Sequence, residues 1–581
     1  MNLRDISFPL NVYAAMLTWS DIPLEYLHYG LHATADEPIG QAQRRASELL
    51  WAHMPPAPCR VLEVGVGLGT TLERLHSLGY QALGITPDEA QASIALGRHG
   101  AAVQVQVCRL EDLPAQEQPF ELMLFQESAQ YIEPLDLFEA ADRLLVGEGA
   151  NLLLMDEFAL RREDDAHAGL HYYDHFIALA GRFGWQVEQM LDLGEQAAPT
   201  LNAIEAMIGR HYKRLVAEIG VSPEQLDMLS SSARRYRKLY DARVYGYRML
   251  RLRRPSRTLL RLGAVTAAQA PAVRELFQRS FGVEMDPATW HWKYGEGNGR
   301  AVGLWRCKTL VAHYAGFSRQ VHLMGQQALA CQVGDVMVAP EVKAGLDRQG
   351  PLHKISATLL ESQIGWGRPH AVGFGFPNAR AMRVAQKLGL YAPVDAVLAL
   401  SWPALSEMPD QTRADAFVLS ALREDSALWQ ELDLVWVAMA SSFANSALGV
   451  RDPAWLRQRY GRHPHAPYTA MLLRSATDQR CLGAVILRVR EDAVELLDVL
   501  GAREQLLNLV RLARFNAQVL GRERLEAWVT RSHRACFDDP ADLATEMPLD
   551  VTVPANAHSP GWSPLELQDR WFLMGGDTDF R

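Results

Sequence analysis

The stretch VLEVGVGLGTT, residues 61–71, constrains the fold of this chain more than any other feature. The apolar run RVLEV ends in glycines at Gly65, Gly67 and Gly69, and leucines at helical spacing follow. A strand, a glycine turn and a helix in this order begin a doubly wound parallel sheet, and glycines let the main chain approach a ligand closely. We therefore predict an N-terminal α/β domain that binds a nucleotide-containing cofactor on this turn.

The neighbouring residues discriminate between the cofactors that such a turn can hold, which include NAD, FAD and S-adenosylmethionine. A dinucleotide site favours G-x-G-x-x-G with an acid about 20 residues further on. This chain has G-x-G-x-G, and the next predicted strand, ALGIT, ends on Thr86. Glu63 precedes the first glycine by two residues, and a carboxylate there suits a ligand that carries a positive ammonium group. The residues disfavour NAD and favour S-adenosylmethionine.

Successive segments after the glycine turn, GITPDEAQ, RLEDLP, FELMLFQESAQYIEP and GANLLLMDEF, resemble the motifs of class I S-adenosylmethionine-dependent methyltransferases. The resemblance covers about residues 1–250. GITPDEAQ is similar to the branch of cyclopropane fatty acid synthases and small-molecule methyltransferases. The resemblance implies a Rossmann-like fold in which these residues contact the cofactor: Glu63, the three glycines, Thr86 and Gln91 at the ribose, Glu111 and Asp112 at the adenine, and Gln126 at the reaction centre.

Methyl transfer from a sulfonium needs alignment, and it needs a base if the acceptor is a hydroxyl or an ammonium group. Glu127 is our candidate for that base, with His171 and His175 as alternatives. The two histidines share a helix face and could also be metal ligands, but no third ligand stands at a useful spacing, so we predict no metal. We expect His28 and Tyr29 to belong to a lid over the cofactor.

A repeated motif organises the second part of the chain. DPATWHWKYG begins at Asp286, and DPAWLRQRYG begins in the same register at Asp452. Each copy follows a predicted helix and precedes apolar runs in a hairpin arrangement, which indicates a tandem duplication. We therefore predict an α/β chain with these domains: residues 1–255 as the cofactor-binding domain, 256–400 and 421–581 as the two repeats, and 401–420 as a linker.

The first repeat continues with ACQVGDVMVAPEVKAGLDRQGPLHK, a strand, a loop with glycines and basic residues, and then a helix. Such a helix N-terminus presents main-chain N–H groups to a pyrophosphate. The segment resembles the acyl-CoA site of GCN5-related N-acetyltransferases (GNATs), and FGFPN with the closing WFLMGGDTDF is similar to a branch that includes tandem-domain and polysaccharide-associated enzymes. The resemblance implies two GNAT-like domains and contacts to acetyl-CoA or another acyl-CoA from Val336, Val338, Gly345, Arg348, Gln349, Gly350, Leu352 and Asn378.

Two departures from the GNAT pattern bear on catalysis. The phosphate loop of the family reads R/Q-x-x-G-x-G/A, whereas KAGLDRQGPLHK is irregular. The position of the aromatic general acid falls at Ala385, so Asp335 or a water would take the proton of the amine. The second repeat has no glycine-rich basic loop in LLDVLGAREQLLNLVRLARF, and we predict that it completes the sheet or shapes the acceptor pocket.

Composition limits the partners. The net charge of −10 does not favour nucleic acid, and no apolar run approaches the length of a membrane span, so we expect a cytoplasmic protein. Residues 234–257 are basic and aromatic, and we interpret them as a helix with a solvated basic face or, alternatively, as a membrane-surface contact. Six scattered cysteines without CxxC pairs indicate reduced thiols.

These features predict a bifunctional transferase that methylates with S-adenosylmethionine and N-acylates with acyl-CoA. The expected acceptor is a small molecule or a nucleotide-linked amino sugar, and the resemblance suggests a role in surface glycan synthesis. The alternative is a methyltransferase, or a related methylene-transfer or cyclising enzyme, whose GNAT-like half is an inactive recognition module for its substrate or carrier. The oligomeric state stays open.

Overall fold

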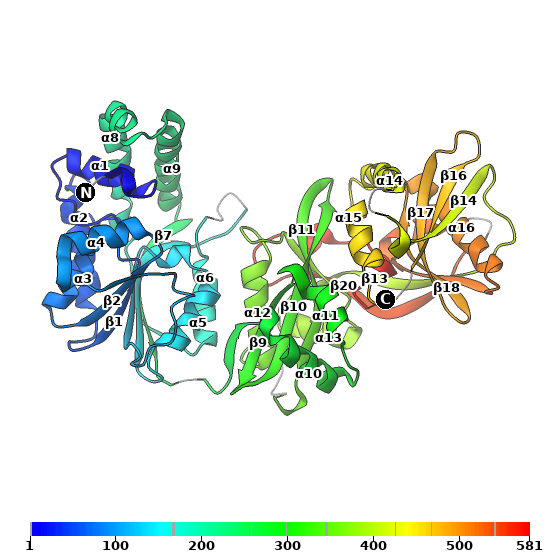
Figure 1. The fold of residues 1–581 in the computed structure, drawn as a ribbon, viewed down its shortest axis with the longest axis horizontal. Coiled ribbons are helices and arrows are strands. Elements are labelled where there is room, and N and C mark those ends of the chain that lie inside the picture. Colours follow the sequence, from blue (N-terminus) through cyan, green and yellow to red (C-terminus); the bar gives the residue numbers. More distant parts are fainter. Residues whose placement is uncertain are drawn as a thin grey trace. The chain divides into compact units, whose positions relative to one another are not determined.

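The computed structural model describes residues 3–164, 169–256, 258–297, 299–342, 347–423, 426–465, 468–539 and 542–580. The chain forms two compact units, Met1–Gly263 and Ala264–Arg581 (Figure 1). The second unit contains the predicted second repeat and the predicted first repeat from Ala264 onward, while residues 256–263 belong to the first unit. Among the described residues, no helix is both long enough and apolar enough to cross a membrane.

The first unit is built on a seven-stranded sheet in the order β3-β2-β1-β4-β5-β7-β6. Neighbours from β3 to β5 run parallel, whereas β7 is antiparallel to both β5 and β6. The strands are β1 (Arg60–Val64), β2 (Gln81–Thr86), β3 (Val105–Val107), β4 (Leu122–Gln126), β5 (Ala150–Ala159), β6 (Gln186–Asp192) and β7 (Tyr245–Arg254). The doubly wound domain predicted from the glycine turn is therefore confirmed.

Helices cover this sheet and extend beyond it. They are α1 (Leu10–Trp19), α2 (Ile39–Ala52), α3 (Thr70–Ser77), α4 (Glu89–His99), α5 (Pro134–Leu144), α6 (Tyr173–Arg182), α7 (Gly194–Ala197), α8 (Pro199–Arg214) and α9 (Pro223–Asp241). In Figure 1, α1, α8 and α9 lie together at one end of the unit. They share a small apolar core that includes Val12, Ile208 and Leu226, and this core packs the helices against one another.

The second unit contains two further seven-stranded sheets. The first includes the path β12-β11-β10-β15-β21, with β9 on β10 and β8 on β9, and the second has the order β14-β16-β17-β18-β19-β13-β20. The strands are β8 (Arg261–Ala264), β9 (Gly299–Arg306), β10 (Thr309–Leu323), β11 (Gln326–Val338), β12 (Val372–Phe374), β13 (Tyr391–Pro403), β14 (Thr412–Val418), β15 (Ala447–Gly449), β16 (Thr469–Ser475), β17 (Cys481–Val489), β18 (Ala493–Leu500), β19 (Arg524–Thr530), β20 (Thr545–Asn556) and β21 (Trp571–Phe572). The helices are α10 (Ala270–Phe281), α11 (Pro287–Tyr294), α12 (Pro351–Gln363), α13 (Ala379–Lys387), α14 (Leu428–Ser442), α15 (Pro453–Leu456), α16 (Leu506–Val519) and α17 (Pro564–Leu567).

The two repeats exchange strands. β13 lies at the end of the first repeat in the chain but pairs with β19 and β20 in the second sheet. Conversely, β15 and β21 come from the second repeat and join the first sheet through β10. Residues 401–420, which we predicted as a linker, contain the end of β13 and the whole of β14. The exchange makes the two repeats one compact unit.

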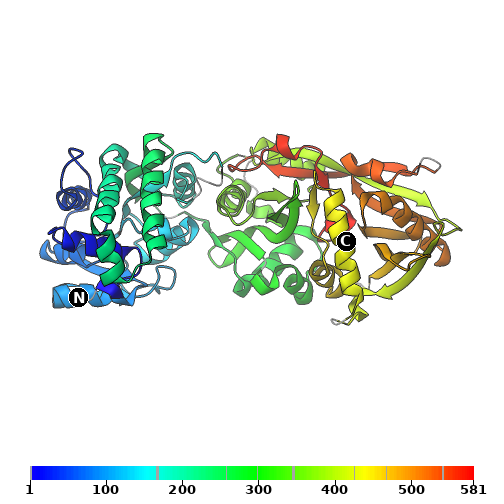
Figure 2. The ribbon, with the colours of Figure 1, turned by 90° about the horizontal axis from the view of Figure 1, so that it is seen from above.

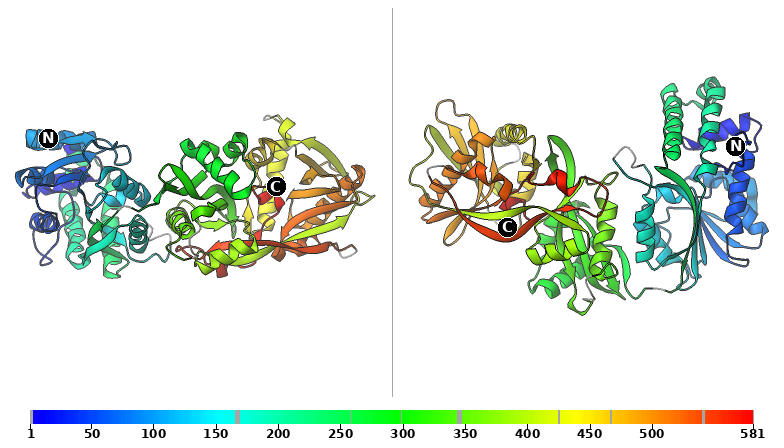
Figure 3. Two further views of the ribbon diagram at one scale, coloured as in Figure 1. Left: turned by 90° about the horizontal axis from the view of Figure 1, so that it is seen from below. Right: turned by 180° about the vertical axis from the view of Figure 1, so that it is seen from behind.

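A buried ionic network holds the C-terminal segment between the repeats. Arg451 has no exposed side-chain surface, and its guanidinium donates to Asp498 and to Asp577, each at 2.6 Å. Arg319 of β10 lies 3.5 Å from the other carboxylate oxygen of Asp577. Figures 2 and 3 show the C-terminus between the first repeat in green and the second repeat in orange. The segment is thus a structural part of the interior.

Asp577→Ala should destabilise the second unit strongly, because it leaves Arg319 and Arg451 short of a buried carboxylate. Breaking one partner of a buried pair typically costs about 3–5 kcal/mol. Urea unfolding of the full chain measures this loss. Asp492→Ala is the matched control, because it removes an ion pair to Arg524 on the surface, where the Asp492 side chain is 65% exposed. This substitution should leave the unfolding midpoint unchanged. Equal effects of the two substitutions would contradict this account of the network.

Candidate functional site

The glycine turn places the main chain in conformations that only glycine adopts without strain. Gly65, Gly67 and Gly69 have φ values of +86°, +49° and +79°. A Cβ at Gly65 would lie 2.6 Å from Cβ of Ser128, and one at Gly69 would lie 2.7 Å from Cβ of Ala95. At Gly67, no described atom lies within 4 Å of such a Cβ. Two of the glycines thus allow close packing, and the middle one leaves open space for a ligand.

Glu63 lies on β1 immediately before this turn. Its side chain is 4% exposed, and no described residue donates a hydrogen bond to its Oε2. Burial raises the pKa of Glu63 to about 8. An orphaned buried carboxyl oxygen is costly, and a cationic group relieves the cost. Glu63 therefore fits the ammonium group of S-adenosylmethionine.

The other predicted cofactor contacts on this edge have different surroundings. Thr86 is buried at the end of β2, and its hydroxyl accepts a hydrogen bond from the Asp88 N–H at 3.1 Å. The Gln91 amide lies 3.5 Å from the Asp88 carboxylate. Glu111 and Asp112 are exposed after β3. The hydroxyl of Thr86 thus shapes the turn that begins α4, while the acid pair faces solvent.

Glu127 follows β4 and lies among tyrosines. Its Oε1 accepts hydrogen bonds from the Tyr29 N–H and the Tyr247 hydroxyl, both at 2.6 Å. The rings of these tyrosines stack with centroids 5.9 Å apart. Burial, together with the carboxylates of Glu157 and Asp156, raises the pKa of Glu127 well above its ordinary value. The structure thus brings Glu127 and the predicted lid residue Tyr29 together.

Two acids at the end of β5, which the sequence analysis missed, accompany Glu127. Burial raises the pKa of Asp156 to about 8 and that of Glu157 to about 7. Glu157 accepts a hydrogen bond from the Tyr240 hydroxyl at 2.7 Å. The segment MDEF could have indicated these acids, because acids at the carboxyl end of a parallel strand lie where α/β proteins bind ligands.

Gln126 and His28 join β4 to the N-terminal lid. The Gln126 amide donates to Ser47 Oγ at 3.1 Å and to His28 Nε2 at 2.9 Å. His28 Nδ1 lies 2.7 Å from the Tyr29 carbonyl, so Nδ1 carries the proton and Nε2 accepts. Burial lowers the pKa of His28 to about 4, which agrees with a neutral ring. His28 therefore orients the lid.

His171 lies before α6, which begins at Tyr173, so it does not share a helix face with His175 as predicted, and its ring contacts the loop after β4. Its Nε2 lies 3.2 Å from the Ala129 carbonyl and 2.9 Å from the Ile132 carbonyl, so this nitrogen is a donor. The proton on Nε2 excludes this nitrogen as the base for methyl transfer. Within the described ranges, no group of three His, Cys, Asp or Glu side chains could hold a metal ion.

The basic segment 234–257 is part helix and part strand. The predicted helix is wrong beyond Asp241, where α9 ends, because the chain continues into the central sheet as β7. Two arginines of β7 pair with acids of β6, Arg248 with Asp192 at 3.5 Å and Arg251 with Glu188 at 3.3 Å. The segment therefore supplies tyrosines to the candidate site, while these two arginines stabilise the sheet edge.

The second candidate site lies along β11. Its pairing with β12 ends at Gln332 and Phe374, while β11 continues to Val338. A register shift opposite His313 and a φ of +49° at Asp335 mark a bulge in this part of the strand. β11 thus extends beyond its pairing with β12, and Val336 on this extension is 38% exposed while Val338 is half-buried.

The loop after β11 leads to the N-terminus of α12. Gly350 is its N-cap and Pro351 its first residue, so the first main-chain N–H groups, including that of Leu352, have no partner within the helix. Arg348 and Gln349 are exposed just before it, and Gly345 lies outside the described residues. Asn378 caps α13, because its Oδ1 accepts from the Ala381 N–H at 2.9 Å. The N-terminus of α12 beside the part of β11 that extends past β12 fits the pyrophosphate and arm of acyl-CoA.

The Asp335 carboxylate is held by two groups of α11. It lies 2.7 Å from Lys293 Nζ and accepts a hydrogen bond from the Tyr294 hydroxyl. Lys293 also contacts Asp579 at 2.5 Å. Burial alone would lower the pKa of Lys293, but Asp579 and Asp335 raise it above its ordinary value. Sequence reasoning missed Lys293 and Asp579, since they lie far from the strand–loop–helix signal.

Family comparisons agree with this geometry. Residues 61–149 match the model of a methyltransferase domain, and residues 262–391 match that of an acetyltransferase (GNAT) domain. The chain contains a methyltransferase domain and a GNAT domain. No curated protein matches it.

Solved structures with similar folds are distant in sequence. The [4+2]-cyclase SpnF is 18% identical with a TM-score of 0.37, and the match covers 44% of this chain and 95% of that one. Geranyl diphosphate C-methyltransferase from Streptomyces coelicolor A3(2), with S-adenosyl-L-homocysteine, is 16% identical with a TM-score of 0.32 and coverages of 43% and 98%. A probable N-acyltransferase from Enterococcus faecalis V583 is 14% identical with a TM-score of 0.41 and coverages of 54% and 74%.

Binding of S-adenosylmethionine at pH 7 should release about one proton, because Glu63 is protonated below a pKa of about 8 and an ammonium partner favours its ionised form. Titration calorimetry in buffers of different ionisation enthalpy measures the release. Glu63→Gln should bind more weakly and release no proton. Identical proton release by both proteins would contradict the assignment of Glu63.

Gly350→Asp should weaken acetyl-CoA binding at least tenfold, because it adds a negative charge where the pyrophosphate is expected. Aspartate and asparagine are both good N-caps, so α12 should keep its stability in either variant. Gly350→Asn is the neutral control and should bind nearly as the wild type does. Equal affinities of the two variants in a calorimetric titration would exclude an anion site at this helix N-terminus.

Proposed function

We propose that this chain is a bifunctional transferase, which methylates with S-adenosylmethionine in its first unit and N-acylates with acyl-CoA in its second. The observation that carries the proposal is that one chain contains two sheet edges of the kind that bind cofactors. One is a positive-φ glycine turn behind the orphaned Glu63 carboxyl, and the other is the open edge of β11 that leads to the Gly350-capped helix.

In the first unit, the bound cofactor would supply an electrophilic methyl group. The glycine turn and Glu63 would orient its methionine part, with Thr86, Glu111, Asp112 and Gln126 along the remaining edge. Glu127 would take the proton of a hydroxyl or ammonium acceptor. Burial raises its pKa, which makes the ionised carboxylate a stronger proton acceptor.

In the second unit, acyl-CoA would supply an activated acyl group as a thioester. The N-terminus of α12, with Arg348 and Gln349, would bind the pyrophosphate, and Val336 and Val338 would line the pantetheine arm. Alignment of the amine with the thioester would provide much of the rate. Asp335, or a water beside it, would receive the amine proton.

The acceptor we propose is a small molecule that carries an amine, such as a nucleotide-linked amino sugar of glycan synthesis. A specific observation supports a second candidate function, a recognition module in place of the acyltransferase. Lys293 pairs with Asp335, and Ala385 offers no phenol, so the proton-transfer groups of this half are weak.

Product mass tests both halves at once. The full chain is incubated with S-adenosylmethionine, acetyl-CoA and nucleotide-linked amino sugars. Products heavier by a methyl group and by an acetyl group support the bifunctional proposal. Methylated product alone, although acetyl-CoA binds, would favour the recognition module.

Glu127→Gln should lower kcat for methyl transfer by about 10²–10⁴-fold, the usual contribution of a general base. The wild-type rate should rise with pH through the pKa of Glu127, because only the ionised carboxylate accepts a proton. Initial rates across a pH series, together with the Kd of S-adenosylmethionine, check this expectation. An unchanged kcat, or loss of cofactor affinity in place of rate, would contradict a role as base.

A further inference from the structure

We propose that the acyl acceptor is a primary amine that binds in a pocket shared by the two repeats, where the buried Gln332 Oε1 accepts its hydrogen bond. This inference rests on the proposed acyltransferase function and deepens it. It assigns to the second repeat half of the acceptor pocket.

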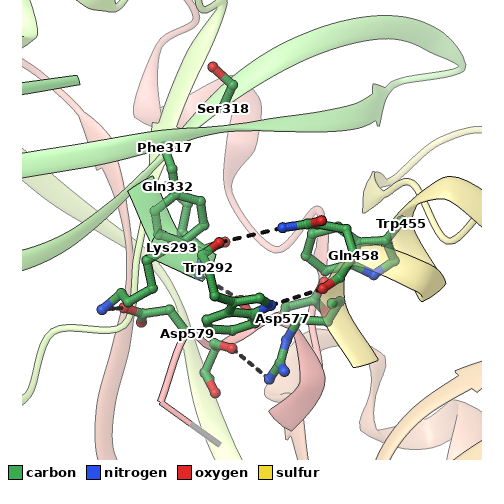
Figure 4. Close-up of a pocket in the computed structure, with 11 residues that line it drawn as sticks. Trp292, Lys293, Phe317, Ser318, Gln332, Trp455, Gln458, Asp577 and Asp579 are labelled. Carbon is green, nitrogen blue, oxygen red and sulfur yellow. Dashed lines mark hydrogen bonds and ion pairs between the residues drawn. The ribbon is translucent and has the colours of Figure 1, made fainter. Parts of the chain in front are cut away.

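The pocket lies where the two copies of the repeated motif meet. Trp292 of the first copy donates from Nε1 to the Gln458 carbonyl of the second at 2.9 Å, and the Gln458 side-chain amide lies 3.5 Å from the Trp292 carbonyl (Figure 4). These residues occupy the same position of the repeat, so the copies pair through equivalent positions. The cavity between them contains about 510 Å³ of empty space, part of it open to solvent.

Gln332 lines this pocket and is only 1% exposed. Its Nε2 donates to the Asp577 carbonyl at 2.7 Å, which fixes the orientation of the amide. Its Oε1 has no donor among the residues that the structure describes. A buried amide oxygen is normally satisfied, so this atom marks the place of a ligand group that donates.

The position of Gln332 also connects the pocket to the acyl-CoA edge. Gln332 is the last β11 residue that pairs with β12, and the open stretch from Val333 to Val338 begins directly after it. A donor group hydrogen-bonded to Oε1 would thus lie beside the strand along which the thioester arrives. Asp579 also lies at this part of β11, because a Cβ added at Gly334 would lie 3.1 Å from the Asp579 carboxylate.

The second repeat supplies part of the lining of the acceptor pocket. Trp455 and Gln458 line the pocket, and the Arg319 guanidinium lies 3.3 Å above the Trp455 ring. This repeat passes from β18 to α16 through residues 501–505 without a glycine-rich loop. Its contribution to acylation is therefore the acceptor wall and not a second acyl-CoA site.

The chemistry of the step identifies the donor as an amine. The amine nitrogen attacks the thioester carbonyl, a C–N bond forms, and the C–S bond breaks. The amine proton passes through water or Asp335 and ends on the coenzyme A thiol. An amine with two N–H groups can donate one to Gln332 Oε1 while its lone pair attacks.

Ligand-detected NMR on the full chain tests the pocket independently of turnover. Glucosamine and phenethylamine are the probes, and glucose and phenethyl alcohol are their hydroxyl counterparts. Gln332→Met removes the carbonyl. Gln458→Trp narrows the pocket with the residue that the first repeat already carries at this position. Gln430→Trp, at an exposed position of α14, is the matched control.

At least one amine should bind saturably and at least tenfold more tightly than its hydroxyl counterpart. Both pocket variants should weaken this binding at least tenfold with an unchanged Kd for acetyl-CoA, and the control should have no effect. Binding of neither amine, binding that neither variant weakens, or equal binding of the hydroxyl counterparts would overturn the inference. Amine binding with this variant pattern but without acetyl transfer would leave the inference standing and refute the proposed acyltransferase activity.

Discussion

The side chain of Arg451, with no exposed surface, is the constraint on which the second unit depends. Charges taken out of water require partners with good geometry. Asp498 of the second repeat and Asp577 of the C-terminal segment supply them, and Arg319 adds a contact from the first repeat. Because these partners come from three separate parts of the chain, the network forms only when both repeats and the C-terminal segment are in place. The acceptor pocket therefore exists only in the assembled unit.

The strand exchange and the shared pocket give a physical reason for the second repeat, which has no glycine-rich loop for acyl-CoA. The second repeat supplies β15 and β21 to the first sheet, and the first supplies β13 to the second. Removing either repeat would expose strand edges and apolar surface, such as the side of β10 that β15 covers. In this account, the duplication produced one acceptor pocket lined by both repeats, and only the first repeat carries an acyl-CoA site.

Local signals in the sequence predicted the elements that depend on local physics. The glycines at 65, 67 and 69 do adopt positive φ, and a strand, a turn and a helix follow in the expected order. The repeated motif is likewise visible in both copies, since Asp286 and Asp452 each cap a helix. These features depend on a few neighbouring residues, so one sequence suffices to read them.

Features formed by segments that are distant in the chain could not be predicted from the sequence. Tyr29, Glu127 and Tyr247 meet only after folding, and periodicity says nothing about which strand joins which sheet. The segment 234–257 suggested a helix because Tyr236, Tyr240, Val244 and Tyr247 recur at three and four residues. Its second half instead forms β7, which pairs between β5 and β6 in the sheet. Gln332 appears ordinary until its burial and its unsatisfied Oε1 are known.

Native mass spectrometry of the full chain with both cofactors present tests the central claim most directly. The account predicts one S-adenosylmethionine and one acetyl-CoA per chain, each bound whether or not the other is present. A chain that binds S-adenosylmethionine but no acetyl-CoA, or that binds two molecules of acetyl-CoA, would contradict it.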